Sequence, residues 1–174
     1  MKKTLSFVLA LVLALAVAVP AFAADGTPSS VNTPGGTDVH VTYDYSESYM
    51  VTIPADFNTN PDNEGSVQVT AKGRLSYGKT LNVVVASAHE DASSHVWNLA
   101  NEQDQKVTYY LSKTPGGSPA LTNASNSILS LNATELPALE SDSPYAVNLY
   151  HKITGTVQYA GVYQDTLTFT VSVS

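Results

Sequence analysis

The chain has 174 residues, no cysteine and a formal net charge of −7 at pH 7. Its length fits one domain, and the lack of cysteine excludes a disulfide-stapled scaffold, so packing and strand pairing must hold the fold together. The acidic excess argues against nucleic acids and anionic lipid surfaces as partners, because both repel a negatively charged protein.

Residues 1–23 have the three regions of a secretory signal peptide. A basic region at 2–3 is followed by a mostly apolar run at 5–19 and by the small-residue cleavage site Ala21-Phe22-Ala23. The apolar run is shorter than the roughly 20 residues that span a membrane. We predict cleavage before Ala24 and expect no integral membrane span in the mature protein.

The mature chain is predicted to be more acidic than the precursor. Two of the eight Lys and Arg residues lie in the signal peptide, so six remain against 15 acidic residues, a net charge of −9. The sequence has no lipid-attachment cysteine and no LPxTG signal. We therefore expect a secreted, extracellular protein that associates with the cell surface through non-covalent contacts.

The mature sequence opens with a segment typical of linkers. Residues 24–36 are rich in Gly, Pro, Ser and Thr, which predicts a flexible leader, and we expect the ordered domain at 37–174. Period-two alternation at 38–45 predicts the first strand, and a second extended piece at 48–53 is closed by Pro54. The residues of the first strand expected to face inward are Val39, Val41, Tyr43 and Tyr45.

The middle of the domain predicts four further strands, one of them almost wholly apolar as in the centre of a sheet. These strands are expected at 67–72, 81–85 (the apolar one), 96–99 and 107–111, with turn-rich loops at 55–65 and 112–127.

The C-terminal part shows the clearest alternation. It predicts one long strand at 145–159 and a second at 167–173, joined by a tight turn at Ala160-Gly161. Gly155 lies in the apolar register of the long strand, which indicates a bulge or a close backbone approach. Eight or nine strands over about 138 residues predict an all-β fold, an immunoglobulin-like antiparallel β-sandwich.

Two loops carry side chains that can ligate metals. The first holds His89, Glu90, Asp91 and His95. Its histidines are six positions apart instead of the four of a helical HExxH motif, so a solvated hairpin tip is the simpler interpretation. The loop at 56–64 alternates Asp, Asn and Glu like a calcium loop, but Pro61 stands where such a loop needs glycine. We assign no metal ligand and no cofactor.

The sequence predicts no enzyme. It has no GxSxG nucleophile elbow, and His151 lies in the apolar register of a strand, which favours a core histidine over a catalytic one. We therefore assign no catalytic residue. Lys72, Lys152 and Asp165 leave open a covalent Lys–Asn cross-link of the kind found in Gram-positive pilin domains.

Aromatic residues leave a sugar-binding alternative open. The chain has ten Tyr and one Trp, and such rings can stack on sugars. The simpler interpretation is that Trp97 anchors the core and that most tyrosines fill it from inward-alternating positions. These tyrosines are Tyr43, Tyr45, Tyr109, Tyr145 and Tyr159.

Short stretches resemble secreted β-sandwich surface proteins of Gram-positive bacteria. They are Tyr49-Met-Val-Thr-Ile-Pro-Ala55 and the ending Gly161-Val-Tyr-Gln-Asp-Thr-Leu-Thr-Phe-Thr-Val-Ser-Val173, similar to endings of pilin-like and spore-coat-type subunits. Trp97-Asn98-Leu99 matches the WxL tripeptide of wall-binding domains. The resemblance implies an extracellular, non-enzymatic structural or adhesive role and transfers no site residues.

The last strand gives a physical hint about partners. An uncharged, perfectly alternating strand at 167–173 would recruit another strand if it lay at a sheet edge. Pairing within its own sheet is the simpler interpretation, and exchange between subunits, with 39–45 as the donated strand, is the sharper hypothesis. We expect self-association through terminal strands, or binding of surface glycans.

These observations rank three functions. The leading expectation is a secreted surface or extracellular-matrix protein that acts in adhesion or in fibre assembly. The alternative is a carbohydrate-binding module, and a secreted metal-dependent hydrolase is a distant third.

Overall fold

The computed structural model describes residue 43 and residues 45–174. The predicted signal peptide 1–23, the predicted leader 24–36 and most of the strand predicted at 38–45 lie outside the described residues. Within the described part no helix is long and apolar enough to cross a membrane. Its eight strands are β1 (Ser48–Thr52), β2 (Gly65–Arg74), β3 (Thr80–Ser87), β4 (Trp97–Ala100), β5 (Lys106–Ser112), β6 (Ser127–Asn132), β7 (Tyr145–Ile153) and β8 (Leu167–Val173).

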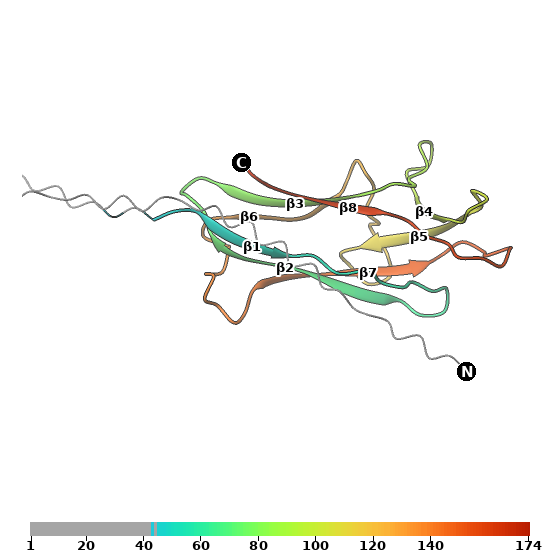
Figure 1. The fold of residues 1–174 in the computed structure, drawn as a ribbon, viewed down its shortest axis with the longest axis horizontal. Helices are drawn as coiled ribbons and strands as arrows, with labels where there is room; N and C mark the ends of the chain where they lie inside the picture. The colour runs from blue at the N-terminus through green and yellow to red at the C-terminus, as the bar shows by residue number, and fades with distance from the viewer. Residues whose placement is uncertain (1–42, 44) are drawn as a thin grey trace, which may run out of the picture.

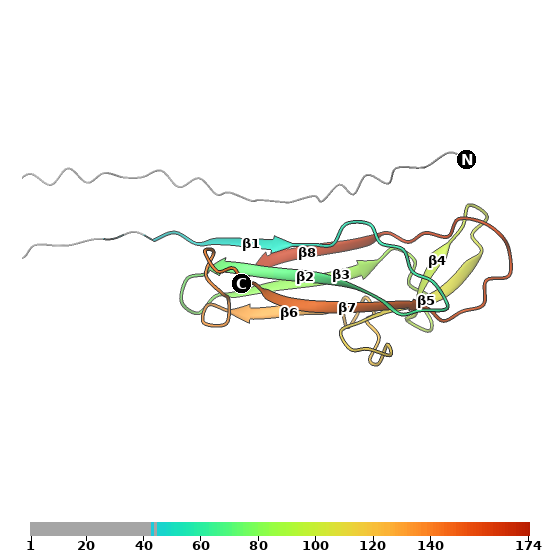
Figure 2. The same cartoon turned by 90° about the horizontal axis from the view of Figure 1, so that it is seen from below.

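The strands form two antiparallel sheets that face each other (Figures 1 and 2). One sheet has five strands in the order β1-β2-β7-β5-β4, and the other has three in the order β6-β3-β8. This arrangement confirms the predicted all-β class and the antiparallel β-sandwich.

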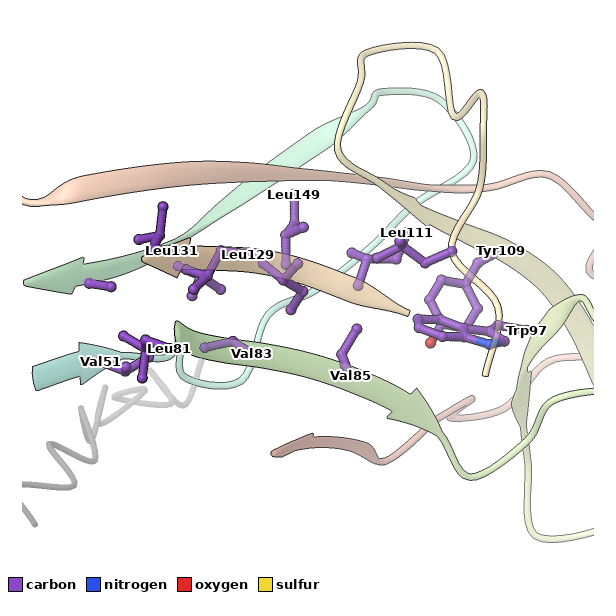
Figure 3. Packing of buried hydrophobic residues seen from close by; sticks show 14 of the residues in the cluster. Val51, Leu81, Val83, Val85, Trp97, Tyr109, Leu111, Leu129, Leu131 and Leu149 are labelled. Atoms are coloured by element: carbon purple, nitrogen blue, oxygen red, sulfur yellow. The ribbon is translucent and has the colours of Figure 1, made fainter. Parts of the chain in front are cut away.

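The core lies between the sheets and is built from inward-facing residues of both (Figure 3). Leu81, Val83 and Val85 of β3 have no exposed surface, and Leu111 and Leu149 of the facing sheet are equally buried. Each such side chain contributes about 1.5–3 kcal/mol by leaving water. Trp97 and Tyr109 close one end of the core, so the prediction that Trp97 is a core anchor is confirmed. Further buried apolar residues are Val69, Val107, Ile128 and Leu131.

The C-terminal strands are arranged differently from the prediction. The strand predicted at 145–159 ends at Ile153, and β7 and β8 are not joined by a tight turn, because they belong to different sheets. Residues 154–166 carry the chain across the sandwich. At the crossing the amides of Thr154 and Gly155 both donate to the Thr108 carbonyl, each at 2.9 Å. A Cβ on Gly155 would lie 2.8 Å from the Thr108 nitrogen, which confirms the expected close backbone approach.

The sequence analysis missed β6. Its residues Ile128, Leu129 and Leu131 are buried, and the strand pairs with β3 across a register shift between Val83 and Val84. It follows the long loop predicted at 112–127, so only six residues carry its pattern. Such a short apolar stretch is weak evidence for a strand.

The prediction that tyrosines fill the core is right for one of five. Tyr109 is buried, but Tyr43 is 82% exposed and Tyr45 is 54% exposed, because both precede β1 and belong to no described strand. Tyr145 and Tyr159 are exposed as well, the first at the outer end of β7 and the second beyond it in the crossing segment.

Candidate functional site

The candidate site is the outer side of β8, residues 167–173, which we call the β8 edge. β8 is the last strand of the three-stranded sheet and pairs with β3 from Leu81–Val173 to Ser87–Leu167. No other described strand pairs with it. Its outward backbone N–H and C=O groups therefore remain available to another strand.

The side chains of β8 leave this edge unprotected. The strand has no charged residue, no proline and no glycine, the features that block pairing at natural sheet edges. Its Thr168, Thr170 and Ser172 are exposed, whereas its apolar residues pack against the core. The apolar row is Leu167, Phe169, Val171 and Val173.

The apolar row of β8 is incompletely covered. The apolar residues of β3 on the same face have no exposed surface, whereas all four residues of the β8 row are only half-buried. The difference follows from position, because β3 has a strand on each side and β8 has one on a single side. β1, the edge strand of the facing sheet, lies on the same side of the sandwich (Figure 2).

The other described edges are shorter or covered. β4 has four residues, and the crossing segment pairs with it, since Ala100 and Gln164 exchange backbone hydrogen bonds of 2.8 and 2.9 Å. β1 has five residues and β6 has six. β8, with seven uncharged residues, is the longest edge strand of the described sheets.

A buried carboxylate fixes the start of β8. The side chain of Asp165 is 2% exposed, and its Oδ2 accepts hydrogen bonds from Ser87 Oγ and Tyr109 Oη, both at 2.6 Å. Ser87 ends β3 and Tyr109 lies in β5, so one carboxylate connects the two sheets. Burial, and then the hydrogen bond to Asp165, raise the pKa of the Tyr109 hydroxyl above its ordinary range. Thr166 donates its amide to Asp165 Oδ1 at 2.8 Å, which orients the chain into β8.

This cluster is arranged for structure and not for nucleophilic catalysis. In a Ser–His–Asp triad the imidazole stands between the hydroxyl and the acid. Here Ser87 Oγ donates directly to Asp165 and accepts the amide of His89 at 3.0 Å. His89 Nδ1 lies 3.1 Å from Asp165 Oδ1 without hydrogen-bond geometry, so that nitrogen is buried without a partner among the described residues.

The loop at 89–95 does not gather its metal-capable side chains. His89 faces Asp165, while His95 Nδ1 lies 3.8 Å from a carboxylate oxygen of Glu90. Asp91 Oδ1 accepts the amides of Ser93 and Ser94 as a turn cap, which lowers the pKa of Asp91. Over the described residues, no group of three or more His, Asp or Glu side chains could hold a metal ion.

The loop predicted at 56–64 is held by local hydrogen bonds. Asn60 Oδ1 accepts the amides of Asp62 and Asn63, at 3.0 and 2.7 Å, as expected of a polar turn. Glu64 accepts the hydroxyl of Tyr110 and, at 2.7 Å, the amide of Gly116. These bonds lower the pKa of Glu64. The pKa of Tyr110 is raised to about 12, mainly by desolvation and secondly by its hydrogen bond to the Glu64 carboxylate.

His151 is a buried histidine, as its register predicts. It is 3% exposed, its ring centroid lies 4.5 Å from that of Phe57, and its Nδ1 has no hydrogen-bond partner among the described residues. Desolvation lowers the pKa of His151, and the charge of Glu64 opposes this shift. Nothing around the ring supports catalysis.

The three residues considered for a covalent cross-link are not brought together. Lys72 Nζ donates to the Ser141 carbonyl at 3.2 Å, and Lys152 Nζ donates to the Asp62 carbonyl at 3.4 Å. Asp165 is occupied by Ser87 and Tyr109 instead. The structure therefore provides no Lys–Asn–acid arrangement at these positions.

The described residues before β1 contact one another and the end of β2. Tyr43 and Tyr45 stack with their ring centroids 5.6 Å apart, and the Arg74 guanidinium lies 4.5 Å from the centroid of Tyr45. Glu47 Oε1 accepts the amide of Ser76 at 3.0 Å, which lowers the pKa of Glu47. These contacts hold the segment at the end of β2, in line with β1 (Figure 1).

Comparison with known proteins assigns no family. No protein-family model matches the chain, and no curated protein matches it. A similar solved structure is described by the words "Chaperone-tip adhesin complex is vital for synergistic activation of CFA/I fimbriae biogenesis". It is 17% identical over 78% of this chain and 40% of its own length, with a TM-score of 0.43. That TM-score is too low to carry a structural or functional assignment.

Proposed function

We propose that the protein is a secreted, non-enzymatic surface or extracellular-matrix protein that acts in adhesion or fibre assembly, with strand pairing between copies as the contact. The β8 edge carries this proposal, because it combines an unpaired backbone with a half-covered apolar row. Pairing with a strand of another copy would satisfy the backbone groups and cover that row. The secreted location rests on the sequence of residues 1–23.

A carbohydrate-binding module is the second candidate. Exposed tyrosines favour it, among them Tyr77 and Tyr159, because exposed rings can stack on sugars. These two residues, however, lie in the β2–β3 turn and in the crossing segment, at opposite ends of the sandwich (Figure 1). They form no common platform for a sugar chain, so we rank this function below assembly.

The proposal is tested with the mature chain, residues 24–174, by size-exclusion chromatography and electron microscopy. Thr170→Lys puts a charge on the β8 edge at an exposed position, whereas Ser130→Lys puts the same charge on the exposed face of β6. We expect the wild-type chain and Ser130→Lys to assemble, and Thr170→Lys to remain monomeric with an unchanged circular dichroism spectrum.

A strictly monomeric wild-type chain that binds a glycan would overturn the assembly proposal in favour of the sugar-binding module. Equal assembly of the two lysine variants would also count against it, because the contact would then lie elsewhere.

A further inference from the structure

The further inference concerns which strand occupies the β8 edge. It rests on the proposed function, because it names the partner of that surface. The occupant must supply backbone groups in extended conformation and alternate apolar side chains, since the four half-buried residues of β8 recur at every second position. The other described edge strands with a free side, β1 and β6, have five and six residues and are both shorter than β8.

Residues 38–45, which we call the donor segment, have this chemistry. Their sequence Asp-Val-His-Val-Thr-Tyr-Asp-Tyr places four apolar or aromatic residues at alternate positions, as many as the row of β8. The segment contains no proline or glycine, and eight extended residues span about 26 Å, long enough to cover seven-residue β8.

The donor segment contributes nothing to its own core where it is described. Tyr43 and Tyr45 are largely exposed and precede β1 without joining a sheet. Two aromatic side chains that are exposed to solvent leave apolar surface that can be buried against a partner. The uncovered row of β8 and the uncovered residues of this segment are therefore complementary.

The described end of the donor segment contacts β2, because Tyr45 lies against the Arg74 guanidinium. Only Ser46 and Glu47 separate Tyr45 from β1, which belongs to the opposite sheet. Facing sheets lie about 10 Å apart, and the contacts of Tyr45 with Arg74 and of Glu47 with Ser76 hold this link at the end of β2. To reach the β8 edge of the same copy, the chain would have to break these contacts and reverse.

We infer that the donor segment of one copy pairs with the β8 edge of a second copy and places Val39, Val41, Tyr43 and Tyr45 on the same face as the half-buried apolar row of β8. The donor and the acceptor are different surfaces, so the contact is heterologous. Each copy then offers one unused donor and one unused edge, so pairing continues from copy to copy, as a ring if the rotation closes and as an open filament if it does not.

Cysteine cross-linking tests this pairing cleanly, because the chain has no cysteine of its own. Thr42→Cys labels the donor segment on the face opposite its apolar residues. Thr168→Cys, Thr170→Cys and Ser172→Cys label the exposed face of β8 at three successive registers. Each acceptor variant is mixed with the donor variant under mild oxidation, and covalent dimers are measured on non-reducing gels.

We expect one of the three acceptors to give at least a tenfold excess of donor–acceptor dimer over Ser130→Cys, the matched control on the exposed face of β6. Dimers formed by an acceptor variant alone would show that β8 pairs with β8, and would overturn the inference. Dimers formed by Thr42→Cys alone would overturn it as well, because donor would then meet donor.

A deletion separates this inference from the proposed function. We expect the chain that begins at Ser46 to stay monomeric. If it assembles, and Thr170→Lys still abolishes assembly, the β8 edge is the contact but the donor segment is not its occupant. If the complete mature chain never assembles, the proposed function itself is wrong.

Discussion

Asp165 shows how one residue can fix the position of a strand. Its carboxylate accepts two short hydrogen bonds from hydroxyls of opposite sheets, directly before β8 begins. The sequence identified Asp165 only as a member of a hypothetical cross-link, because no local pattern reveals that Ser87 and Tyr109 meet it across 78 and 56 positions. Long-range polar contacts of this kind follow from the fold and not from spacing.

Replacing Asp165 should therefore be costly. Asp165→Ala leaves the hydroxyls of Ser87 and Tyr109 buried without their acceptor, and we expect it to lower the free energy of unfolding by about 2–5 kcal/mol. Urea denaturation measures the loss, with Asp142→Ala, at an exposed position, as the control. A loss as small as that of the control would show that the buried carboxylate is dispensable.

His151 gives the protein a pH dependence with a definite sign. Its pKa is lowered in the folded state, whereas a histidine in the unfolded chain has a pKa of about 6.5. Between these two pKa values the unfolded chain binds a proton at His151 and the folded chain does not. Stability is then lost as the pH falls below about 6.5 towards the folded pKa. Glu64, whose pKa is also lowered, loses its contribution only below its ordinary value of 4.5.

The histidine contribution can be isolated by substitution. His151→Leu removes the titrating group, and Nδ1 has no hydrogen bond to lose. We expect the free energy of unfolding of the variant to fall less than that of the wild type between about pH 7.5 and about pH 5.5. Urea unfolding at both pH values measures the difference. Equal slopes for the two proteins would contradict a lowered pKa at His151.

Individual strands were predictable where alternation was long. β2, β5 and β8 carry at least seven residues with one buried or half-buried face and were predicted from alternation, whereas β3 was predicted as an almost wholly apolar central strand. Alternation reports which side of a strand is apolar but not which strand lies beside it. For this reason the sheet partners of β7 and β8 could not be predicted. β6 does not alternate regularly, because Ile128 and Leu129 are adjacent and both buried.

The crossing from β7 towards β8 depends on Gly155. A side chain there would meet the Thr108 nitrogen at 2.8 Å, whereas at Gly161 the nearest atom would be at 3.6 Å. We expect Gly155→Ala to cost about 1–3 kcal/mol through local overpacking, and Gly161→Ala to be near neutral. Thermal or urea unfolding of the pair checks this. A neutral Gly155→Ala would show that the end of β7 adjusts freely.

The candidate site became visible only at the level of the whole sheet. The uncharged alternation of 167–173 predicted a hazard at an edge, but the sequence alone favoured pairing within the sheet over exposure. β8 pairs with β3 within its own sheet, as the simpler interpretation expects, but the strand order places β8 outermost, so its other side has no partner among the described strands. The exposed Tyr43 and Tyr45, predicted to be buried, then become the natural counterpart of this edge.

Charge at the scale of the whole molecule should control how strongly copies associate. Copies with a net charge of −9 after signal cleavage repel one another. β8 has no charged residue, so its attraction for a partner strand includes no ion pair that salt would weaken. Raising the ionic strength from about 0.01 M to about 0.5 M shortens the Debye length from about 30 Å to below 10 Å, which weakens the repulsion but leaves backbone pairing and apolar burial intact.

We therefore expect assembly of the mature chain to increase with salt, measured by light scattering at fixed protein concentration. Thr170→Lys should stay monomeric at both ionic strengths, because its lysine still lies on the β8 edge, and this separates edge pairing from salt-driven precipitation. Assembly that instead dissolves in high salt would mean that ion pairs hold the copies together. The contact would then involve charged surfaces such as the Arg74–Glu140 pair, and not the uncharged edge of β8.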